Sequence, residues 1–342
     1  MTDSTGQSAE QQSGKSIIVL HAGALGDCVL TLALVRAMKA SWGAPSVAMA
    51  GRSGIVAWAK RHGLVSEAYA LDPLGLHALY RADAELPEAT RELFQRAHRI
   101  VSFLGGPTDP VSVRLRELLG DKFMAVDPKV NDDTLRVGRH ITQQWADDLA
   151  KLGGAIQSSA CIPFGISKER RKTHRQRLEA WLRSRGADSY AQAQARPLQS
   201  ITLCHPGSGG LDKCVPLESL ETLVRSLRRD GATLAWMVGP DEVERFGPSW
   251  LQRLEVSAPV IFEEKLDVAA DLVCGADAYI GHDAGMTHVA ALAGTRTLAI
   301  FGPTDARIWR PVGSCCTIVG FPEAGDSLDT WVRTLTSQLW ER

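Results

Sequence analysis

The sequence predicts an α/β protein with two Rossmann-like halves, each built on a doubly wound parallel sheet, that face each other across a cleft. Two observations support this fold class. Short apolar runs of strand length alternate with helical spacings of apolar residues along most of the chain, which is typical of parallel sheets covered by helices. The series then begins again near residue 201, and a chain of 342 residues suits two domains better than one.

The first half is expected to contain five strands separated by helices. Its first strand is an apolar run that leads into a glycine-containing turn and then into a helical pattern. The strands are expected at residues 16–20, 45–49, 67–71, 100–104 and 123–126. Helices are expected at residues 29–40, 55–62 and 141–152.

The second half repeats this pattern with six strands. They are expected at residues 201–204, 233–238, 260–262, 278–280, 297–300 and 316–319. A last helix, at residues 328–340, is expected to pack back across the first half.

A basic helix at residues 168–185 and a segment of linker composition at 186–195 separate the halves, so we expect the boundary near residue 190. The resulting division is a disordered tail at 1–14, a first domain at 15–165, the basic helix and linker at 166–198, a second domain at 199–322 and the C-terminal segment at 323–342.

Composition excludes several classes of protein. The chain carries 38 basic and 39 acidic residues, so no overall charge favours nucleic acid. Its seven cysteines contain no C-x-x-C pair, which predicts reduced thiols and neither a disulfide framework nor a zinc site. No apolar run approaches the ~20 residues of a membrane span, and the polar tail lacks the apolar stretch of a secretion signal. We therefore expect a cytoplasmic protein.

Residues 281–305 contain the most informative pattern of the chain. They read as the end of a strand, a glycine turn, a short apolar helix, another strand and a second glycine turn. The first amides of a short helix attract anions such as phosphate. The predicted cradle consists of the backbone N–H groups of Gly285, Met286, Thr287 and His288. The second turn, with Gly302 and Thr304, is expected at the same edge of the sheet and completes a crevice for a phosphorylated ligand.

Other nucleotide sites do not fit. The turn at residues 21–27 has only G-x-x-G, and the second strand ends at 50–52 without an acidic residue, so NAD and FAD are not expected. The sequence also lacks the G-x-x-x-x-G-K-[ST] pattern of a P-loop. No Asp-x-Asp pair ends an apolar strand, which removes the usual carboxylate site for a metal that carries a sugar diphosphate.

Three segments together resemble the ADP-heptose:lipopolysaccharide heptosyltransferases, glycosyltransferase family nine. They are Gly-Ala-Leu-Gly-Asp at 23–27 running into 30–36, His-Pro-Gly-Ser-Gly at 205–209 with Lys213 and Pro216, and 283–288 through 301–305 with Trp309. The resemblance spans roughly residues 16–320. It implies a GT-B fold and an inverting, metal-independent transfer, with the acceptor on the first domain and the nucleotide sugar on the second.

The implied donor is ADP-heptose, and the implied acceptor is a lipopolysaccharide-core or related glycan. The chain departs from the family after Lys213, where Arg or His and then Trp are usual and Cys214 and Val215 stand here. Two alternatives therefore stay open. One is the same fold with a different nucleotide sugar, and the other is a non-catalytic nucleotide-sugar-binding protein.

The resemblance assigns two catalytic residues. Asp27 matches the proposed base of the family, although an Asp before an apolar helix commonly caps its amides. Lys213 matches the cation that offsets the charge of the departing diphosphate. A surface lysine is the ordinary alternative. Ser208 is expected to donate to a phosphate oxygen, or else to be a turn serine.

Two acidic residues are expected at the nucleotide sugar. Asp283 lies beside the donor in the family, and its alternative role is to cap the helix that follows it. Glu242 occurs where an acid can reach ribose hydroxyls, and its alternative is an exposed acid that opens a helix. His282, Asp283 and His288 lack the spacing of metal ligands on one helix, and we expect no metal.

The basic helix at residues 168–185 has eight Lys or Arg and two Glu. Such a helix could contact anionic lipid on the cytoplasmic face of the inner membrane or an acidic glycolipid acceptor. A solvated charged face is the alternative. Arg170, Arg171 and Arg177 are the residues that would test this contact.

Overall fold

The computed structural model describes residues 16–81, 84–156, 164–184, 198, 200–322 and 327–340. The expected tail at 1–14 and the linker at 186–195 lie outside these residues. The chain divides into two compact units, residues 1–162 and 163–342, which we call unit 1 and unit 2.

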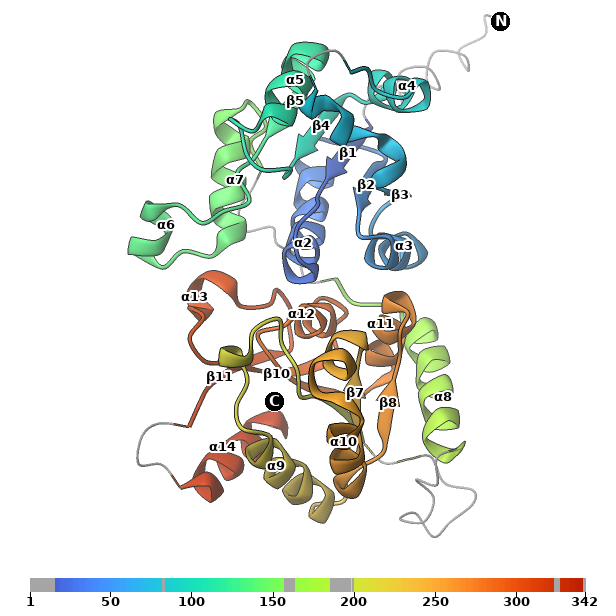
Figure 1. Cartoon of the computed structure of the whole chain (residues 1–342), viewed down its shortest axis with the longest axis vertical. Helices are drawn as coiled ribbons and strands as arrows, with labels where there is room; N and C mark the ends of the chain where they lie inside the picture. The colour runs from blue at the N-terminus through green and yellow to red at the C-terminus, as the bar shows by residue number, and fades with distance from the viewer. Residues whose placement is uncertain are drawn as a thin grey trace, which may run out of the picture. The chain divides into compact units, whose positions relative to one another are not determined.

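Unit 1 contains a five-stranded parallel sheet in the order β3-β2-β1-β4-β5 (Figure 1). The strands are β1 (Ile17–Leu20), β2 (Val47–Gly51), β3 (Glu67–Ala70), β4 (Arg99–Ser102) and β5 (Phe123–Ala125). The helices are α2 (Leu25–Ser41), α3 (Ser53–Arg61), α4 (Glu88–Arg96), α5 (Pro110–Leu119), α6 (Asp132–Val137) and α7 (Ile141–Lys151), with short 3-10 helices η1 (Asp72–Leu74), η2 (Leu76–Tyr80) and η3 (Gly120–Lys122).

Helices cover both faces of this sheet, as parallel strands require. Ile18, Leu20 and Ile100 pack against apolar side chains of η1, η2, α4 and α5. Residues alternate between faces along a strand, so Ile17 and Val19 belong to the opposite face. There α2 packs beside α3 and α7.

Unit 2 contains a six-stranded parallel sheet in the order β11-β10-β9-β6-β7-β8. Among these strands, Figure 1 labels β7, β8, β10 and β11. The strands are β6 (Ile201–His205), β7 (Thr233–Val238), β8 (Val260–Phe262), β9 (Ala278–His282), β10 (Arg296–Phe301) and β11 (Cys316–Gly320). The helices are α8 (Lys168–Ser184), α9 (Leu217–Arg229), α10 (Pro240–Ser257), α11 (Leu266–Gly275), α12 (Gly285–Leu292), α13 (Ala306–Trp309) and α14 (Leu328–Trp340), with the 3-10 helix η6 (Leu211–Lys213).

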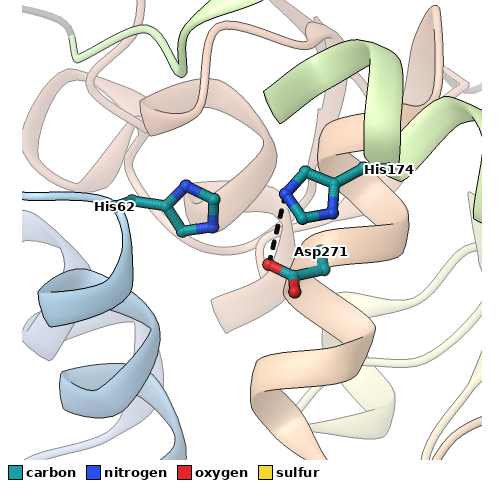
Figure 2. A group of neighbouring side chains, drawn as sticks. All are labelled: His62, His174 and Asp271. Carbon is teal, nitrogen blue, oxygen red and sulfur yellow. Dashed lines mark ion pairs between the residues drawn. The ribbon is translucent and has the colours of Figure 1, made fainter. Parts of the chain in front are cut away.

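The basic helix α8 belongs to unit 2, because it packs along α11. His174 of α8 and Asp271 of α11 are both buried and face each other, with 3.7 Å between Nε2 and Oδ1 (Figure 2). The expected boundary near residue 190 is therefore wrong. The division falls before α8, at residue 162.

The C-terminal helix α14 also packs within unit 2. Trp331, Val332, Leu335 and Leu339 join the core formed by α9 and the central strands. The expectation that residues 328–340 pack on the first half is wrong, because the apolar face of α14 is covered by its own unit.

The two strand orders identify where ligands can bind. In open parallel sheets the binding crevice lies at the carboxyl ends of the strands, where the strand order reverses. That point is between β1 and β4 in unit 1 and between β6 and β9 in unit 2. No helix in the described part of the chain is long and apolar enough to cross a membrane.

Candidate functional site

The predicted nucleotide-sugar residues lie in loops after four adjacent central strands of unit 2. In sheet order these strands are β10, β9, β6 and β7. The loop after β6 carries Ser208 and Lys213, and the turn after β9 leads into α12. Because all strands are parallel, the four loops meet at one edge of the sheet. The reversal point lies between β9 and β6, whose loops carry Asp283 and Lys213.

An ion pair joins the loops at this point. Lys213 Nζ lies 2.8 Å from Asp283 Oδ2, and His288 Nε2 faces Asp283 Oδ1 at 3.7 Å. Burial alone would raise the pKa of Asp283, but hydrogen bonds from His288 and Lys213 and the lysine charge lower it to about 2. Lys213 is thus a paired, half-buried cation and not the free surface lysine of the alternative.

Ser208 also joins the loop after β6 to the turn after β9. Its hydroxyl is buried and donates to the carbonyl oxygen of Asp283 at 2.6 Å. The loop is fastened from outside by Arg245 of α10, which donates to the carbonyl oxygens of Ser208 at 2.7 Å and Gly209 at 3.4 Å. The hydroxyl hydrogen of Ser208 is therefore used within the protein, and its contact with a phosphate stays a prediction.

The start of α12 offers a smaller cradle than expected. The helix begins at Gly285, and the amides of Thr287 and His288 both donate to the carbonyl oxygen of Ala284. The amides of Gly285 and Met286 have no hydrogen-bond partner among the described residues. The expected four-amide cradle is corrected to two, because the first turn of the helix uses the other two for itself.

The hydroxyl of Thr287, near this helix start, also has a hydrogen-bond partner within the protein. Thr287 is fully buried, and its hydroxyl donates to the carbonyl oxygen of His282 at 2.6 Å. Asp283 does not cap the helix, since no side chain caps its N-terminus. The helix dipole and the two open amides thus face outward without a protein anion bonded to them.

Glu242 is buried at the start of α10. Oε2 accepts from the Gly239 amide at 2.9 Å, and Oε1 lies 3.4 Å from His205 Nε2. Burial would raise the pKa of Glu242, but hydrogen bonds from His205 and Gly239 lower it. Gly207 is required beside it, because a Cβ there would lie 2.1 Å from Oε1. The alternative of an exposed acid is wrong, although Glu242 does open a helix.

Cys214 and Val215 depart from the family pattern, and Val215 packs in the core of unit 2. Val215 is buried among α9 and the central strands, and its amide donates to His282 Nε2 at 3.1 Å. Burial lowers the pKa of His282 to about 4 and raises the pKa of the Cys214 thiol to about 11. Both groups are uncharged at neutral pH, and the loop after Lys213 is held without the usual Arg or His and the Trp that follows it.

The second glycine turn is less connected. Gly302 follows β10 and is exposed, and the Phe321 ring fills the space that its Cβ would need, at 2.4 Å. Thr304 is half-buried. Among the described residues, no hydrogen bond joins either one to Lys213 or Asp283. Their contact with a nucleotide sugar stays a prediction.

Asp27 lies at the reversal point of unit 1, in the first turn of the helix that follows β1. Helix α2 begins at Leu25 with Ala24 as its N-cap residue, and no side chain caps it. Asp27 is therefore in the first turn and is not the cap that the alternative proposed. The expected helix began at residue 29, because residues 25–27 lack apolar periodicity.

The basic helix presents fewer charges than its composition indicates. Arg171 donates to the carbonyl oxygens of Cys274 at 3.0 Å and Ala293 at 2.9 Å, at the ends of α11 and α12. Arg175 pairs with Glu179 and Asp277. Arg171 is therefore unsuitable as a test of membrane contact. The exposed basic residues of the helix are Lys168, Arg170, Lys172 and Arg177.

Three residues that shape the nucleotide-sugar site received no role in it from the sequence. His205 and His282 end the two strands at the reversal point, and this position at a strand end was the available signal. Arg245 carries no such signal, because only the packing of α10 brings it to the loop after β6.

Two Rossmann-like units, with a lysine–aspartate pair and an open helix start at the reversal point of the second, define a GT-B glycosyltransferase. Comparisons with known proteins agree. The model of glycosyltransferase family 9 (heptosyltransferase) matches residues 136–330, more than half of the chain. The protein belongs to this family.

Solved structures show the same fold at low sequence identity. The E. coli ADP-heptose lps heptosyltransferase II is 16% identical with a TM-score of 0.64, over 95% of this chain and 98% of that one. A family 9 glycosyltransferase from Veillonella parvula is 15% identical with a TM-score of 0.63, over 94% and 91%. E. coli heptosyltransferase WaaC with ADP is 15% identical with a TM-score of 0.59, over 94% and 99%. A search of curated protein sequences gives no match.

Proposed function

We propose that this glycosyltransferase moves a heptose from ADP-heptose onto a lipopolysaccharide-core or related glycan, with inversion and without a metal. The donor is supported by the family and by the solved E. coli enzyme that carries ADP. The absence of an Asp-x-Asp pair after a strand supports metal independence, since that pair is the usual seat of a diphosphate-bound cation.

The reaction assigns one task to each unit. An acceptor hydroxyl oxygen forms a bond to the anomeric carbon as the bond from that carbon to the diphosphate oxygen breaks. Asp27 of unit 1 takes the hydroxyl proton. The electron pair of the broken bond leaves with ADP, and Lys213 with the Gly285 and Met286 amides stabilises its charge.

The observation that carries this proposal is the Lys213–Asp283 pair beside two open amides at the reversal point of unit 2. A diphosphate can accept from both amides and share Lys213 with Asp283. The carboxylate then stays close to the sugar, where its oxygens can accept from hydroxyls. Glu242, two strands away, is held in place to accept from the ribose.

The test is a comparison of nucleotides and nucleotide sugars as ligands, followed by transfer. A ligand that binds only the folded protein increases its free energy of unfolding, by about 2.7 kcal/mol at a hundredfold excess over Kd. The melting temperature rises as a result. We expect ADP and ADP-heptose to raise it and UDP-sugars not to. Transfer to a heptose-accepting lipopolysaccharide core should persist in EDTA.

The outcomes separate the alternatives. A rise with another nucleotide sugar alone would assign a different donor to the same fold. A rise with ADP-heptose but no transfer to any core acceptor would favour the non-catalytic binding protein. Loss of transfer in EDTA that returns with a divalent cation would overturn metal independence.

The acceptor would be met at the cytoplasmic face of the inner membrane. Support comes from the exposed basic residues Lys168, Arg170, Lys172 and Arg177 on α8, which can attract anionic lipid. Binding to vesicles with and without anionic lipid tests this part of the proposal, with Arg170→Gln and Arg177→Gln expected to weaken it.

A further inference from the structure

The turn that carries Asp27 is organised by a buried histidine at the end of β1. His21 is fully buried, and its Nδ1 accepts from the amide of Gly23 at 3.0 Å. The Sγ atom of Cys28, in the first turns of α2, lies 3.2 Å from the same nitrogen. One ring atom thus joins the strand end, the turn and the helix.

The hydrogen-bond chemistry fixes the state of this histidine. An amide nitrogen can only donate, so Nδ1 carries no proton and accepts from Gly23. The Cys28 thiol can donate to Nδ1 or to the carbonyl oxygen of Gly23, which lies 3.7 Å from Sγ. Burial lowers the pKa of His21 to about 4 and raises the pKa of the Cys28 thiol to about 11. At neutral pH both groups are therefore uncharged, and the imidazole accepts from the Gly23 amide.

This tautomer leaves a buried N–H group without a hydrogen-bond partner in the described part of the chain, which costs stability. Nε2 carries the proton, is buried and has no hydrogen-bond partner among the described residues. The ring lies 5.5 Å from that of Phe103, a position in which a phenyl ring would leave no polar group unpaired. The acceptor at Nδ1 is what a histidine adds here.

Gly23 transmits this arrangement to the carboxylate. A Cβ on Gly23 would lie 2.5 Å from His21 Cε1 and 3.3 Å from Asp27 Oδ2. The imidazole therefore fills the space that a side chain on Gly23 would need, with the carboxylate at its edge, and only glycine lets both groups approach the backbone here. A neutral ring on the same side of Gly23 as the carboxylate adds no positive charge that would lower the basicity of Asp27.

We infer that His21 is a positioning residue for Asp27, and that its Nδ1 fixes the 21–28 turn so that the carboxylate meets the acceptor hydroxyl in one orientation. This inference rests on the proposed function, in which Asp27 is the base. His21 itself touches no substrate in this role. A misplaced base slows the chemical step without altering donor binding.

Two substitutions separate the role of the hydrogen-bond acceptor Nδ1 from that of the aromatic ring. His21→Asn keeps an acceptor near the Nδ1 position, and His21→Phe keeps the ring but removes the acceptor. We expect His21→Phe to lower kcat by about tenfold to a hundredfold, with the KM for donor unchanged. His21→Asn should keep kcat within about threefold of the wild type. His98→Phe, at an exposed histidine of the same unit, is the matched control.

A second measurement does not depend on transfer. Hydrogen–deuterium exchange of the peptide over residues 21–30 should accelerate in His21→Phe and stay near the wild type in His21→Asn. Equal losses of kcat in both variants, a loss confined to donor KM, or unchanged exchange in His21→Phe would each overturn the inference. A wild-type protein without transfer would overturn the proposed function, and exchange would still decide whether His21 fixes the turn.

Discussion

Replacing Asp283 by Asn should break the ion pair with Lys213 at the proposed donor site. The pKa of this carboxyl falls from 3.8 to about 2 in the folded protein. Each unit of pKa difference corresponds to about 1.4 kcal/mol, so the charged carboxylate contributes about 2 kcal/mol to stability at pH 7. Unit 2 has 180 residues, for which this loss lowers the melting temperature by about 4–8 °C.

The pH dependence has a definite sign. Because the folded pKa is lower than the unfolded one, the contribution is complete above the unfolded value and is lost as pH falls toward 2. At pH 3 about half of it remains. The difference in melting temperature between wild type and Asp283→Asn should therefore shrink by about half between pH 7 and pH 3.

Calorimetry with a neighbouring control tests this reasoning. Asp212 is exposed in η6, one residue before Lys213, so Asp212→Asn makes the same charge change without breaking the pair. Combining Asp283→Asn with Lys213→Met gives the coupling energy of the two groups. Equal effects of Asp212→Asn and Asp283→Asn, or an effect of Asp283→Asn that is constant with pH, would refute the assignment.

Three further predictions concern the base, the ribose acid and the packing of α8. Asp27→Asn should slow transfer by about a hundredfold or more and leave the ADP-induced rise in melting temperature intact. Gly207→Ala should displace Glu242, whose Oε1 and Cγ lie 2.1 and 2.6 Å from the new Cβ, and raise the donor KM by about tenfold; Gly209→Ala has open space and should not. Arg171→Met should destabilise unit 2 by about 2–3 kcal/mol in urea unfolding, whereas Lys172→Met, at an exposed position, should have little effect.

The strands were predictable because parallel strands buried on both faces appear in the sequence as nearly continuous apolar runs. Residues 233–238 and 260–262 match β7 and β8 at both ends. Helix starts were harder to locate. Residues 25–27 carry a glycine and an aspartate, so nothing periodic marks the start of α2 four residues before the expected helix at 29.

The fate of individual amides could not be read from the sequence. The motif at 283–288 indicates a helix start, but the number of open N–H groups depends on which residue is the N-cap. With Ala284 in that place, its carbonyl takes the amides of Thr287 and His288. A one-residue difference in the start would expose a different pair, and propensity does not resolve one residue.

The packing of α14 shows a related limit. Its apolar positions predict a buried face but not the surface that buries it. The complementary surface is formed by α9 and the central strands, against which Trp331 and Leu335 pack. The composition of α8 shows the same limit, because the sequence does not reveal that Arg171 and Arg175 use their charge inside unit 2.

The site itself depends on strand order, which alternation of strands and helices does not determine. Lys213 and Asp283 are separated by 70 residues and meet because β9, the fourth strand of unit 2 in chain order, inserts beside β6, the first. Had β9 followed β8 at the edge of the sheet, the same motifs would lie several strands apart, at about 4.8 Å per strand. The lysine would then have no anion to pair with, and the open amides of α12 would have no cation beside them. The reversal of strand order is therefore the step that brings two separate sequence motifs together at the proposed diphosphate site.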